Sequence, residues 1–374
     1  MTDDVSEDIM KQGKIHSGIQ NACLVAVLLL SSVWHVHAID PVLEPYADRV
    51  DTAVNRGLKY LAGVQTQQGF FPGGYGRSPG VVSLVGMAFL AVGHTPGSVP
   101  YRDTLDRCID YVLSQQQANG AIVTHSGTDR TLYSHNISTL FLMEVSGMVD
   151  AGRQKKLDEA IPRAVKLILA AQQVAKPEGH AGGWRYEPNS GDSDLSCSGW
   201  ALLALRAARL NGVPVPDKAI DDAVKYVLKN RKRESGGFAY QGGSPVVGLS
   251  GAALLCLELT GHHGDESTLK AGQYILSELK ALQSTSQYEY DIYYCAQGMF
   301  QLGGVHWERF AQWMYEYWLP RQKADGSWLP EPGSWAAGSG GGTDAYTTSM
   351  MLLSLTVPYR QLPIYQRDET VNEE

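Results

Sequence analysis

A unit of about fifty residues that recurs along the chain is the feature that most constrains its fold. Apolar runs of helical length each follow a turn rich in glycine or aromatic residues. They start near Val81, His135, Asp194, Val247, Asp291 and Asp344. The spacing between successive starts is 44 to 59 residues, and a fixed period of this size is typical of repeat architectures. Because the runs are apolar on most faces, they predict buried helices.

A second, amphipathic helix is expected before each apolar run. In residues 46–64, Val50, Val54 and Leu58 recur at helical spacing, while Asp51 and Lys59 fall on the opposite face. Similar patterns cover residues 101–116, 154–173, 217–229, 266–282 and 307–319. One charged face places these helices on the outside, and strand-like alternation is nearly absent. The sequence therefore predicts an all-α fold, an (α/α)6 toroid of six outer/inner helix pairs.

The connectors between outer and inner helices share a short motif. Its complete copy, Gln322–Trp328, reads Gln-x-x-x-Gly-x-Trp. Partial copies lie at 65–71, 116–122, 182–186 and 236–240. A glutamine can cap or bridge carbonyl groups at the end of an outer helix, a glycine allows a tight turn, and an aromatic ring packs on the next repeat. We interpret the motif as a structural device.

On these residues the chain resembles the prenyltransferase and squalene-cyclase repeat superfamily, whose fold is the α/α toroid. The resemblance is carried by Gln322–Trp328, by Gly182–Tyr186 with Asp192–Leu205, and by Gly236–Tyr240. It covers roughly residues 45–356. Squalene cyclases have two such barrels, and this chain has length for one. The resemblance implies a terpene cyclase or mutase of the isomerase or lyase type that acts on an apolar polyprenyl or triterpenoid substrate.

The N-terminal segment has the pattern of an export signal. Lys11 and Lys14 precede an apolar run, 22–34, that is too short to span a bilayer, and Val36-His37-Ala38 follows as a small-residue cleavage pattern. We expect a signal peptide at 1–38, with export to the periplasm, cell envelope or exterior. An uncleaved anchor and a start at Met10 are the alternatives. Residues 39–357 then form one toroid domain, and 358–374 form an acidic tail, of which residues 360–374 are expected to fray.

Charge and cysteine content narrow the possible partners. The chain carries a formal net charge of −8, and its only dense basic cluster, 229–233, falls where an outer helix should end. Such a short cluster on an acidic chain does not indicate a nucleic-acid surface. The expected partner is an apolar or isoprenoid small molecule, with peripheral membrane association as a further possibility. The cysteines after residue 38 form no Cys-x-x-Cys pair and are expected to be buried thiols.

The turns before the inner helices should form the mouth of the barrel, so their polar and aromatic side chains should face one cavity. The expected substrate-binding residues are His135, Trp184, Tyr186, Phe238, Tyr240, Tyr290, Asp291, Tyr293, Asp344 and Tyr346. Aromatic faces can stabilise a carbocation or stack on a sugar. The alternative for each ring is packing between repeats, and the alternative for Asp344 is an N-cap.

The expected catalytic residues are Asp194 and Asp192, in the run Asp192-Ser193-Asp194-Leu195. The resemblance implies this role, because squalene-hopene-type cyclases protonate an alkene with the middle acid of an Asp-x-Asp-Asp motif. Asp192 and Asp194 match its first two aspartates, and Leu195 replaces the last. Alkene protonation needs a strong acid that is held protonated. The alternative is that Asp194 caps the helix at 195–210.

Other chemistry is only weakly indicated. Protein prenyltransferases hold zinc with an Asp-x-Cys pair and a distant histidine, and the nearest counterpart here is Asp291 and Cys295 with His135. Because the family's spacing is missing, no cofactor is predicted and zinc stays a weak possibility. Phosphate-loop and His-Glu-x-x-His motifs are absent from the sequence. A non-catalytic toroid that binds a lipid, glycan or peptide, and a carbohydrate-active barrel, remain the alternatives to a cyclase.

Overall fold

A computed structural model describes residues 40–124, 130–330, 344–359 and 361–366. The chain divides into two compact units, Met1–Glu44 and Pro45–Glu374. The first unit is described only at residues 40–44, so the expected signal peptide at 1–38 lies outside the described residues. The second unit holds the repeats. None of the helices in the described ranges combines the length and the apolarity that a membrane crossing requires.

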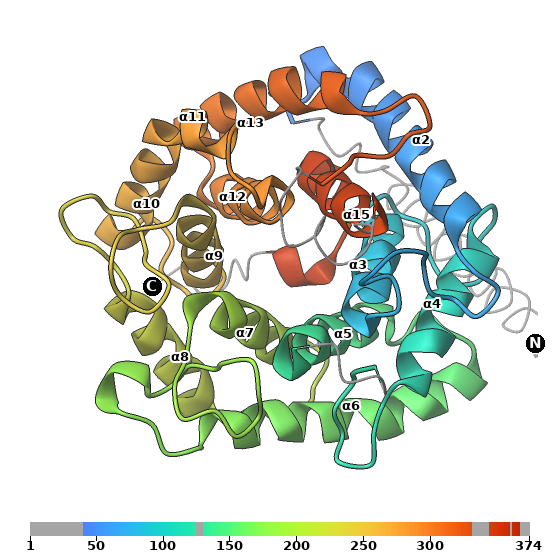
Figure 1. Cartoon of the computed structure of the whole chain (residues 1–374), viewed down its shortest axis with the longest axis horizontal. Helices are drawn as coiled ribbons and strands as arrows, with labels where there is room; N and C mark the ends of the chain where they lie inside the picture. Colours follow the sequence, from blue (N-terminus) through green and yellow to red (C-terminus); the bar gives the residue numbers. More distant parts are fainter. Residues whose placement is uncertain (1–39, 125–129, 331–343, 360, 367–374) are drawn as a thin grey trace, which may run out of the picture. The chain divides into compact units, whose positions relative to one another are not determined.

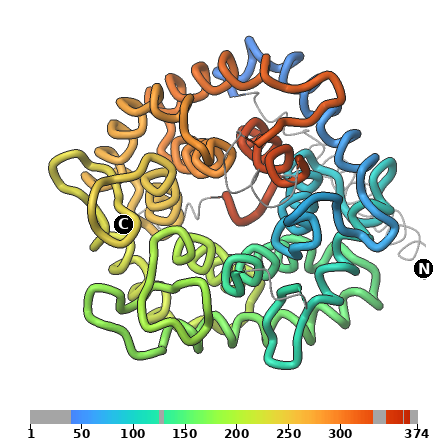
Figure 2. Tube along the Cα trace, viewed as in Figure 1, coloured from blue at the N-terminus to red at the C-terminus, as the bar shows by residue number. Residues whose placement is uncertain are grey.

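The second unit consists of two concentric rings of helices (Figures 1 and 2). The outer ring comprises α2 (Ala47–Val64), α4 (Arg102–Ser114), α6 (Ala151–Gln172), α8 (Asp217–Lys229), α10 (Glu266–Ser277) and α13 (Gly304–Trp318). The inner ring comprises α3 (Pro79–Leu90), α5 (Thr131–Val145), α7 (Leu195–Leu210), α9 (Val247–Glu258), α12 (Tyr288–Leu302) and α15 (Asp344–Leu355). Short helices are α11 (Leu279–Leu282) and the 3-10 turns η2 (Glu178–His180), η3 (Leu319–Arg321), η4 (Val357–Tyr359) and η5 (Pro363–Tyr365).

The predicted all-α toroid is confirmed, and its layering follows from the sequence pattern. Every residue of α3 and of α9 is buried, as expected for helices that are apolar on all faces. The outer helices bury one stripe only, such as Val50, Val54 and Leu58 in α2. The last inner helix, α15, packs against α3 and α2, which closes the ring. The described residues contain isolated β-bridges and no strand.

The motif glutamine joins neighbouring repeats. Gln322 Nε2 donates to the carbonyl of Gly326 in its own turn (2.9 Å) and to that of Ala53 in α2 (2.7 Å). Gln65, Gln116 and Gln172 make the equivalent pair of bonds to their own turn and to the next outer helix. The second acceptor therefore lies in the following repeat. The sequence had suggested a carbonyl at the end of an outer helix. The structure instead places this acceptor inside the next outer helix.

The motif glycine permits the close approach that this bridge needs. Gly326 has φ of +96°, and a Cβ built on it would lie 2.4 Å from the carbonyl oxygen of Arg56 in α2. Gly182 has the same relation to Asp222 of α8, at 2.2 Å. Only glycine fits a left-handed backbone pressed against another helix. The turn is thus fixed by glycine and bonded by glutamine.

Part of the C-terminal tail is packed in the core, which corrects the expectation that the tail frays from residue 360 onwards. Ile364 is fully buried, and the buried Arg206 of α7 donates to the carbonyls of Ile364 (2.5 Å) and Gln366 (2.8 Å). The Tyr365 hydroxyl is hydrogen-bonded to that of Tyr293 in α12. A buried guanidinium needs several acceptors, and the tail supplies them. Residues 367–374 lie outside the described residues.

Candidate functional site

A central cavity of about 570 Å³ lies where the first turns of the inner helices meet. Each of the inner helices named above contributes to its wall. The lining residues are Tyr75, Ser78, Gly80, Val81, Leu84, Arg130, Tyr133, Ser134, Ile137, Tyr186, Ser196, Trp200, Tyr240, Val246, Leu249, Thr285, Gln287, Tyr290, Asp291, Tyr346 and Met350. The wall is therefore aromatic and aliphatic with a few hydroxyl groups. Among the lining residues described, it carries one carboxyl group and one guanidinium.

Half of the expected substrate-binding residues line this cavity: Tyr186, Tyr240, Tyr290, Asp291 and Tyr346. They lie in the turns before the inner helices or in the first helical turn, which is where the sequence placed the mouth. Trp200 also lines the cavity and was not predicted. It lies more than a turn inside α7, and an aromatic residue within an apolar helix gives no signal of its own.

Three of the expected aromatic ligands pack behind the wall. Trp184 and Phe238 are fully buried, and their backbone N–H groups donate to Ser198 (2.9 Å) and Ser250 (2.8 Å) on the adjoining inner helices. Tyr293 is fully buried beneath Trp200, with stacked rings 5.4 Å apart. These rings join repeats and support the cavity floor, and they do not line the cavity.

His135 also lies outside the cavity, contrary to the expectation from the sequence. Its Nδ1 accepts a hydrogen bond from the N–H of Ile122 (3.1 Å), and its Nε2 donates to the carbonyl of Ala164 in α6 (3.1 Å). The ring is fully buried, and burial lowers the pKa of His135 to about 4. A polar residue at a helix start can face either ring of helices. Here it faces outward and holds the turn of its repeat.

Asp344 begins α15 at the edge of the site and is not among the cavity-lining residues. The Tyr60 hydroxyl of α2 lies 3.4 Å from its Oδ2. Burial raises the pKa of Asp344 above its usual value. Its position links the last inner helix to the first outer helix.

Asp194 combines a structural bond with an unusual environment. It is fully buried, and its Oδ1 accepts hydrogen bonds from the Cys197 N–H (2.8 Å) and the Ser196 hydroxyl (2.5 Å), so it caps α7 as the alternative interpretation expected. Its Oδ2 accepts no hydrogen bond, and the nearest cation is Arg185 Nη1 at 3.6 Å. Burial raises the pKa of Asp194, while Ser196, Cys197 and Arg185 lower it.

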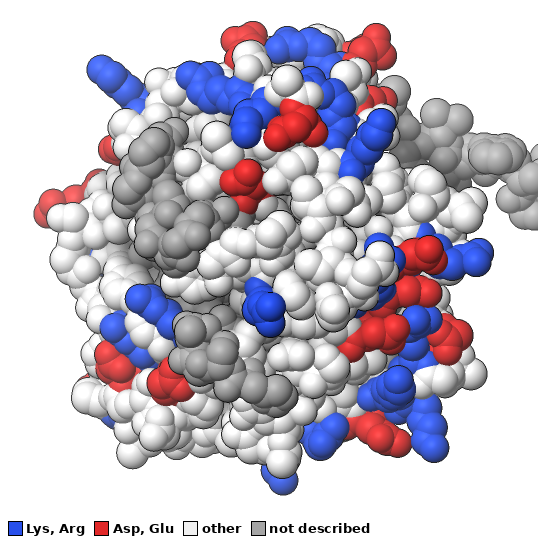
Figure 3. Space-filling model, turned by 45° about the vertical axis from the view of Figure 1, so that its right-hand side comes forward, with Lys and Arg blue, Asp and Glu red and all other residues white. Residues whose placement is uncertain are grey.

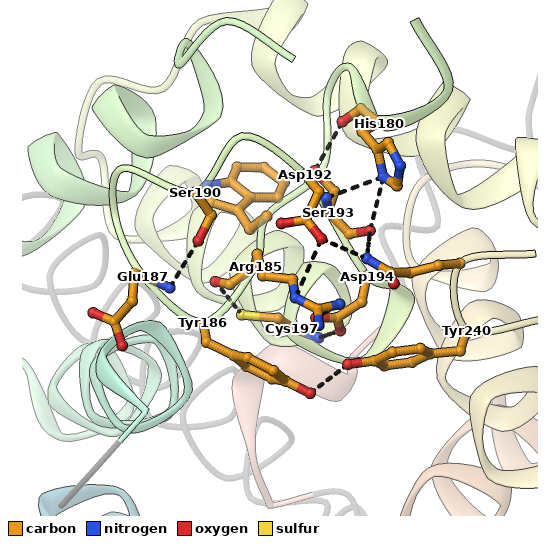
Figure 4. Close-up of polar contacts among 12 residues, drawn as sticks. His180, Arg185, Tyr186, Glu187, Ser190, Asp192, Ser193, Asp194, Cys197 and Tyr240 are labelled. Atoms are coloured by element: carbon orange, nitrogen blue, oxygen red, sulfur yellow. Dashed lines mark hydrogen bonds and ion pairs between the residues drawn. The ribbon is translucent and has the colours of Figure 1, made fainter. Parts of the chain in front are cut away.

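Asp194 lies in a cluster of polar contacts with Arg185, Asp192 and Tyr240 close by (Figure 4). Ser196 and Tyr240 line the cavity, and Asp194 itself does not. The Tyr240 hydroxyl is hydrogen-bonded to that of Tyr186. Arg185 lies between Asp194 and Asp192, and its guanidinium is 4.6 Å from the Tyr186 ring centre. The arrangement is a carboxyl group one layer behind an aromatic wall.

Asp192 is the more exposed of the two aspartates, with 46% of its side chain accessible. Its Oδ2 accepts a hydrogen bond from Gln241 Nε2 (3.0 Å) and lies 3.5 Å from Arg185 Nε. It therefore acts on Asp194 only through Arg185. This differs from two carboxyl groups that share one proton.

Asp291 is the carboxyl group that lines the cavity directly. It is 6% exposed in the first turn of α12, and the Thr285 hydroxyl donates to its Oδ2 (2.8 Å). Burial raises the pKa of Asp291 to about 7, opposed by the Thr285 hydrogen bond. At neutral pH both the protonated and the ionised form of this group are therefore populated.

The zinc arrangement considered from the sequence is not assembled. Asp291 and Cys295 share one helix, but both ring nitrogens of His135 are bonded to the backbone elsewhere. The described residues contain no group of three or more His, Cys, Asp or Glu side chains placed to hold a metal ion. The four described cysteines are buried, unpaired thiols.

The face of the molecule drawn in Figure 3 carries mixed charge. On this face, basic and acidic side chains are interspersed, and no broad patch of a single sign is visible. The backbone phosphates of nucleic acids need a concentrated basic surface, which this face lacks.

Solved structures share the fold. The type II terpene cyclase MstE from Scytonema superposes with a TM-score of 0.56 at 14% identity, over 84% of this chain and 99% of that one. An inactive variant of an α-1,6-mannanase from Salegentibacter gives a TM-score of 0.53 at 9% identity, over 83% of this chain and 98% of that one. No family model and no curated protein matches the sequence. The chain thus shares the α/α toroid fold of these proteins.

Proposed function

We propose that the central cavity binds an apolar molecule of the isoprenoid class and that the chain catalyses its acid-initiated cyclisation. The observation that carries this proposal is the wall of the cavity, where Tyr133, Tyr186, Trp200, Tyr290 and Tyr346 surround a space with a single described carboxyl group. Such rings exclude water and attract positive charge through their faces. A variant of MstE with one substitution has been solved in complex with geranylgeranyl dihydroxybenzoate as substrate.

The proton in this proposal comes from Asp194. In the structure the Ser196 hydroxyl donates to Oδ1 of Asp194 (2.5 Å), and Ser196 is among the residues that line the cavity. When Oδ1 carries a proton, this hydrogen bond reverses and Asp194 donates to Ser196. The Ser196 proton passes to an alkene carbon as Ser196 takes the Asp194 proton. The electron pair of the double bond forms the new C–H bond and leaves a carbocation, which the next double bond attacks. Burial supports this role because it disfavours the charged form of the acid.

A second function is favoured by a specific observation. Oδ1 of Asp194 caps α7, and Arg185 lies 3.6 Å from Oδ2. Both contacts stabilise a carboxylate and weaken its tendency to hold a proton. This arrangement suits a toroid that binds a lipid without transforming it. A glycoside hydrolase is less well supported, because the described lining contains one carboxyl group and retaining or inverting cleavage needs two.

Incubation with squalene and with short polyprenyl substrates tests the proposal. We expect a cyclised product from the unmodified protein and none from Asp194→Asn, which keeps the shape of the cap. Asp158→Asn is the control, since it removes an exposed carboxylate of α6 and Asp158 is not among the residues that line the cavity. It should retain most of the product. If no substrate is consumed while a lipid binds equally to all three proteins, the chain is a binding protein.

We also propose that the chain is exported, from the pattern at 1–38. Expression of the full chain in a bacterium with a periplasm should give a mature protein that begins at Ile39, as measured by N-terminal sequencing and intact mass. Replacement of Leu28 and Leu29 by aspartate should block the cleavage, because it interrupts the apolar run. An intact N-terminus on a membrane-bound protein would instead support the uncleaved anchor.

A further inference from the structure

The carboxyl group of Asp291 fits in the cavity wall because the neighbouring helix has a glycine at the facing position. Asp291 lies on α12, and the facing position on α9 is Gly248. A Cβ at Gly248 would come within 1.8 Å of Asp291 Oδ1. Thr285 holds the other oxygen, Oδ2, at 2.8 Å. Oδ2 is thus positioned by the protein, and the space for Oδ1 depends on the absence of a side chain on α9.

No salt bridge with a lysine, arginine or histidine balances this carboxyl group among the described residues. Arg130 lines the same cavity, but its guanidinium lies over the Tyr186 ring, 4.0 Å from the ring centre, and is not paired with Asp291. The titratable groups near it are Cys295 on α12 and Tyr346 on α15. Burying a carboxylate without a counter-charge is unfavourable. A group kept in this position, facing a cavity, is suited to positive charge supplied by the ligand.

The rings around Asp291 favour the same kind of ligand. Trp200 on α7, Tyr133 on α5 and Tyr346 on α15 line the same cavity from three other helices. Aromatic faces attract cations, and the attraction grows when water is excluded. A carboxylate inside an aromatic wall is therefore an arrangement for a cation with an apolar body. The neighbouring network at Asp194 differs, because Arg185 already supplies its positive charge.

We infer that Asp291 holds the positive charge of a cationic species bound in the cavity and, in the reaction proposed above, accepts the proton whose loss ends it. The second part rests on the proposed function, whereas the first does not. In the terminating step a C–H bond next to the cationic carbon breaks. Its electron pair forms the new double bond, and the proton goes to Oδ1 of Asp291. Asp194 loses one proton and Asp291 gains one, so the product is an isomer of the substrate. Exchange with water then returns a proton to Asp194 and removes one from Asp291 before the next cycle.

Binding of a stable cation tests the first part directly. The probes are octyltrimethylammonium and its neutral carbon isostere, in which a tert-butyl group replaces the trimethylammonium group. Quenching of tryptophan fluorescence reports binding, because Trp200 lines the cavity. At about pH 9, where Asp291 is ionised, we expect the cation to bind roughly tenfold more tightly than the isostere, which corresponds to about 1.4 kcal/mol. Asp291→Asn should remove this preference and leave binding of the isostere unchanged.

The control is Asp158→Asn, which removes an exposed carboxylate of α6 far from the cavity wall. It should keep the full preference for the cation. Gly248→Ala gives a second measurement, because a methyl group there displaces Oδ1 without changing the charge of the protein. The Gly248→Ala substitution should weaken binding of the cation more than binding of the isostere. An equal preference in the unmodified protein and in Asp291→Asn overturns the inference.

Product analysis tests the second part and separates it from the proposed function. With a substrate that the unmodified protein cyclises, Asp291→Asn should still consume substrate but release a different alkene or a water-captured alcohol. Asp194→Asn should consume none. Unchanged products from Asp291→Asn refute the proton-acceptor role. If no substrate is ever consumed, the proposed function fails and the proton-acceptor role falls with it, while the cation preference still decides whether Asp291 holds positive charge.

Discussion

Asp291 and His135 are buried ionisable residues that the sequence placed in the same site and that the structure separates. Asp291 faces the cavity, and His135 bonds two backbone groups behind it. Both were predicted from their position at the start of an inner helix. Position in the sequence fixes the helical turn, but the direction of a side chain depends on which neighbouring backbone groups need a partner. That information comes from other repeats.

The buried carboxyl group of Asp291 should cost stability in alkali. Burial raises its pKa from 3.8 to about 7, so the folded state binds its proton more tightly than the unfolded state does. This contribution is complete below about pH 4 and is lost as the pH rises through 7. Asp291→Asn should therefore exceed the unmodified protein in free energy of unfolding by a few kcal/mol at about pH 8. Urea denaturation at about pH 8 and at about pH 4 measures the difference in free energy of unfolding between the two proteins. This difference should disappear at about pH 4.

His135 should show the opposite dependence. Burial lowers its pKa from 6.5 to about 4, so the unfolded chain binds the proton more tightly. The neutral ring contributes fully above pH 6.5, and its contribution falls by about 3 kcal/mol as the pH falls to 4. His135→Gln should destabilise the protein at pH 7, and the difference from the unmodified protein should shrink towards pH 4. A constant difference across this range would contradict the bonded neutral ring.

At the scale of elements, the repeat turn was the most predictable feature of the chain. The Gln-x-x-x-Gly-x-Trp motif identified the connectors and, through them, the ring. The structure adds that Gln322 bonds to Ala53 in the neighbouring repeat. The sequence could not identify this acceptor, because any backbone carbonyl looks alike in a sequence. Trp184 and Phe238 were likewise assigned to the right turns, but their rings support the wall.

Glycines in and near this turn should differ sharply in their tolerance of alanine. Gly326→Ala places a Cβ against the Arg56 carbonyl in a left-handed backbone, and we expect a loss of about 2 kcal/mol or more in free energy of unfolding. Gly63→Ala in α2 meets no atom within 4 Å and should be neutral or stabilising by up to about 1 kcal/mol. Denaturant unfolding of both variants tests the difference. An unchanged free energy of unfolding in Gly326→Ala would contradict the close packing of Gly326 against α2.

At the scale of the whole molecule, the toroid was predictable because its helix pairs recur with a regular period. The packing of the end of the chain was not predictable. Residues after 357 carry no repeat motif, so their acidic, turn-rich composition suggested a frayed tail. The structure packs Ile364 and Tyr365 against the inner helices α7 and α12, where Arg206 donates to the Ile364 carbonyl and the Tyr293 hydroxyl is hydrogen-bonded to that of Tyr365. A short apolar segment without periodicity gives no sequence signal for docking of this kind.

Truncation should locate the true end of the folded unit. A chain that ends at Gln366 keeps the described contacts of Arg206 and should melt at the same temperature as the full chain. A chain that ends at Tyr359 removes two acceptors of a buried guanidinium and should lose several kcal/mol of stability. Calorimetry of the two truncated proteins decides between a docked and a frayed tail. Equal melting temperatures would support fraying.

The bond between Gln322 and Ala53 joins residues 269 positions apart. Every other copy of this bond spans one repeat, so most of the ring can assemble as the chain is made. The final seam must wait until the last outer helix and its turn have left the ribosome. Until then the first repeat exposes the surface that the last repeat will cover. The order of synthesis therefore makes the cavity the last part of the protein to be enclosed.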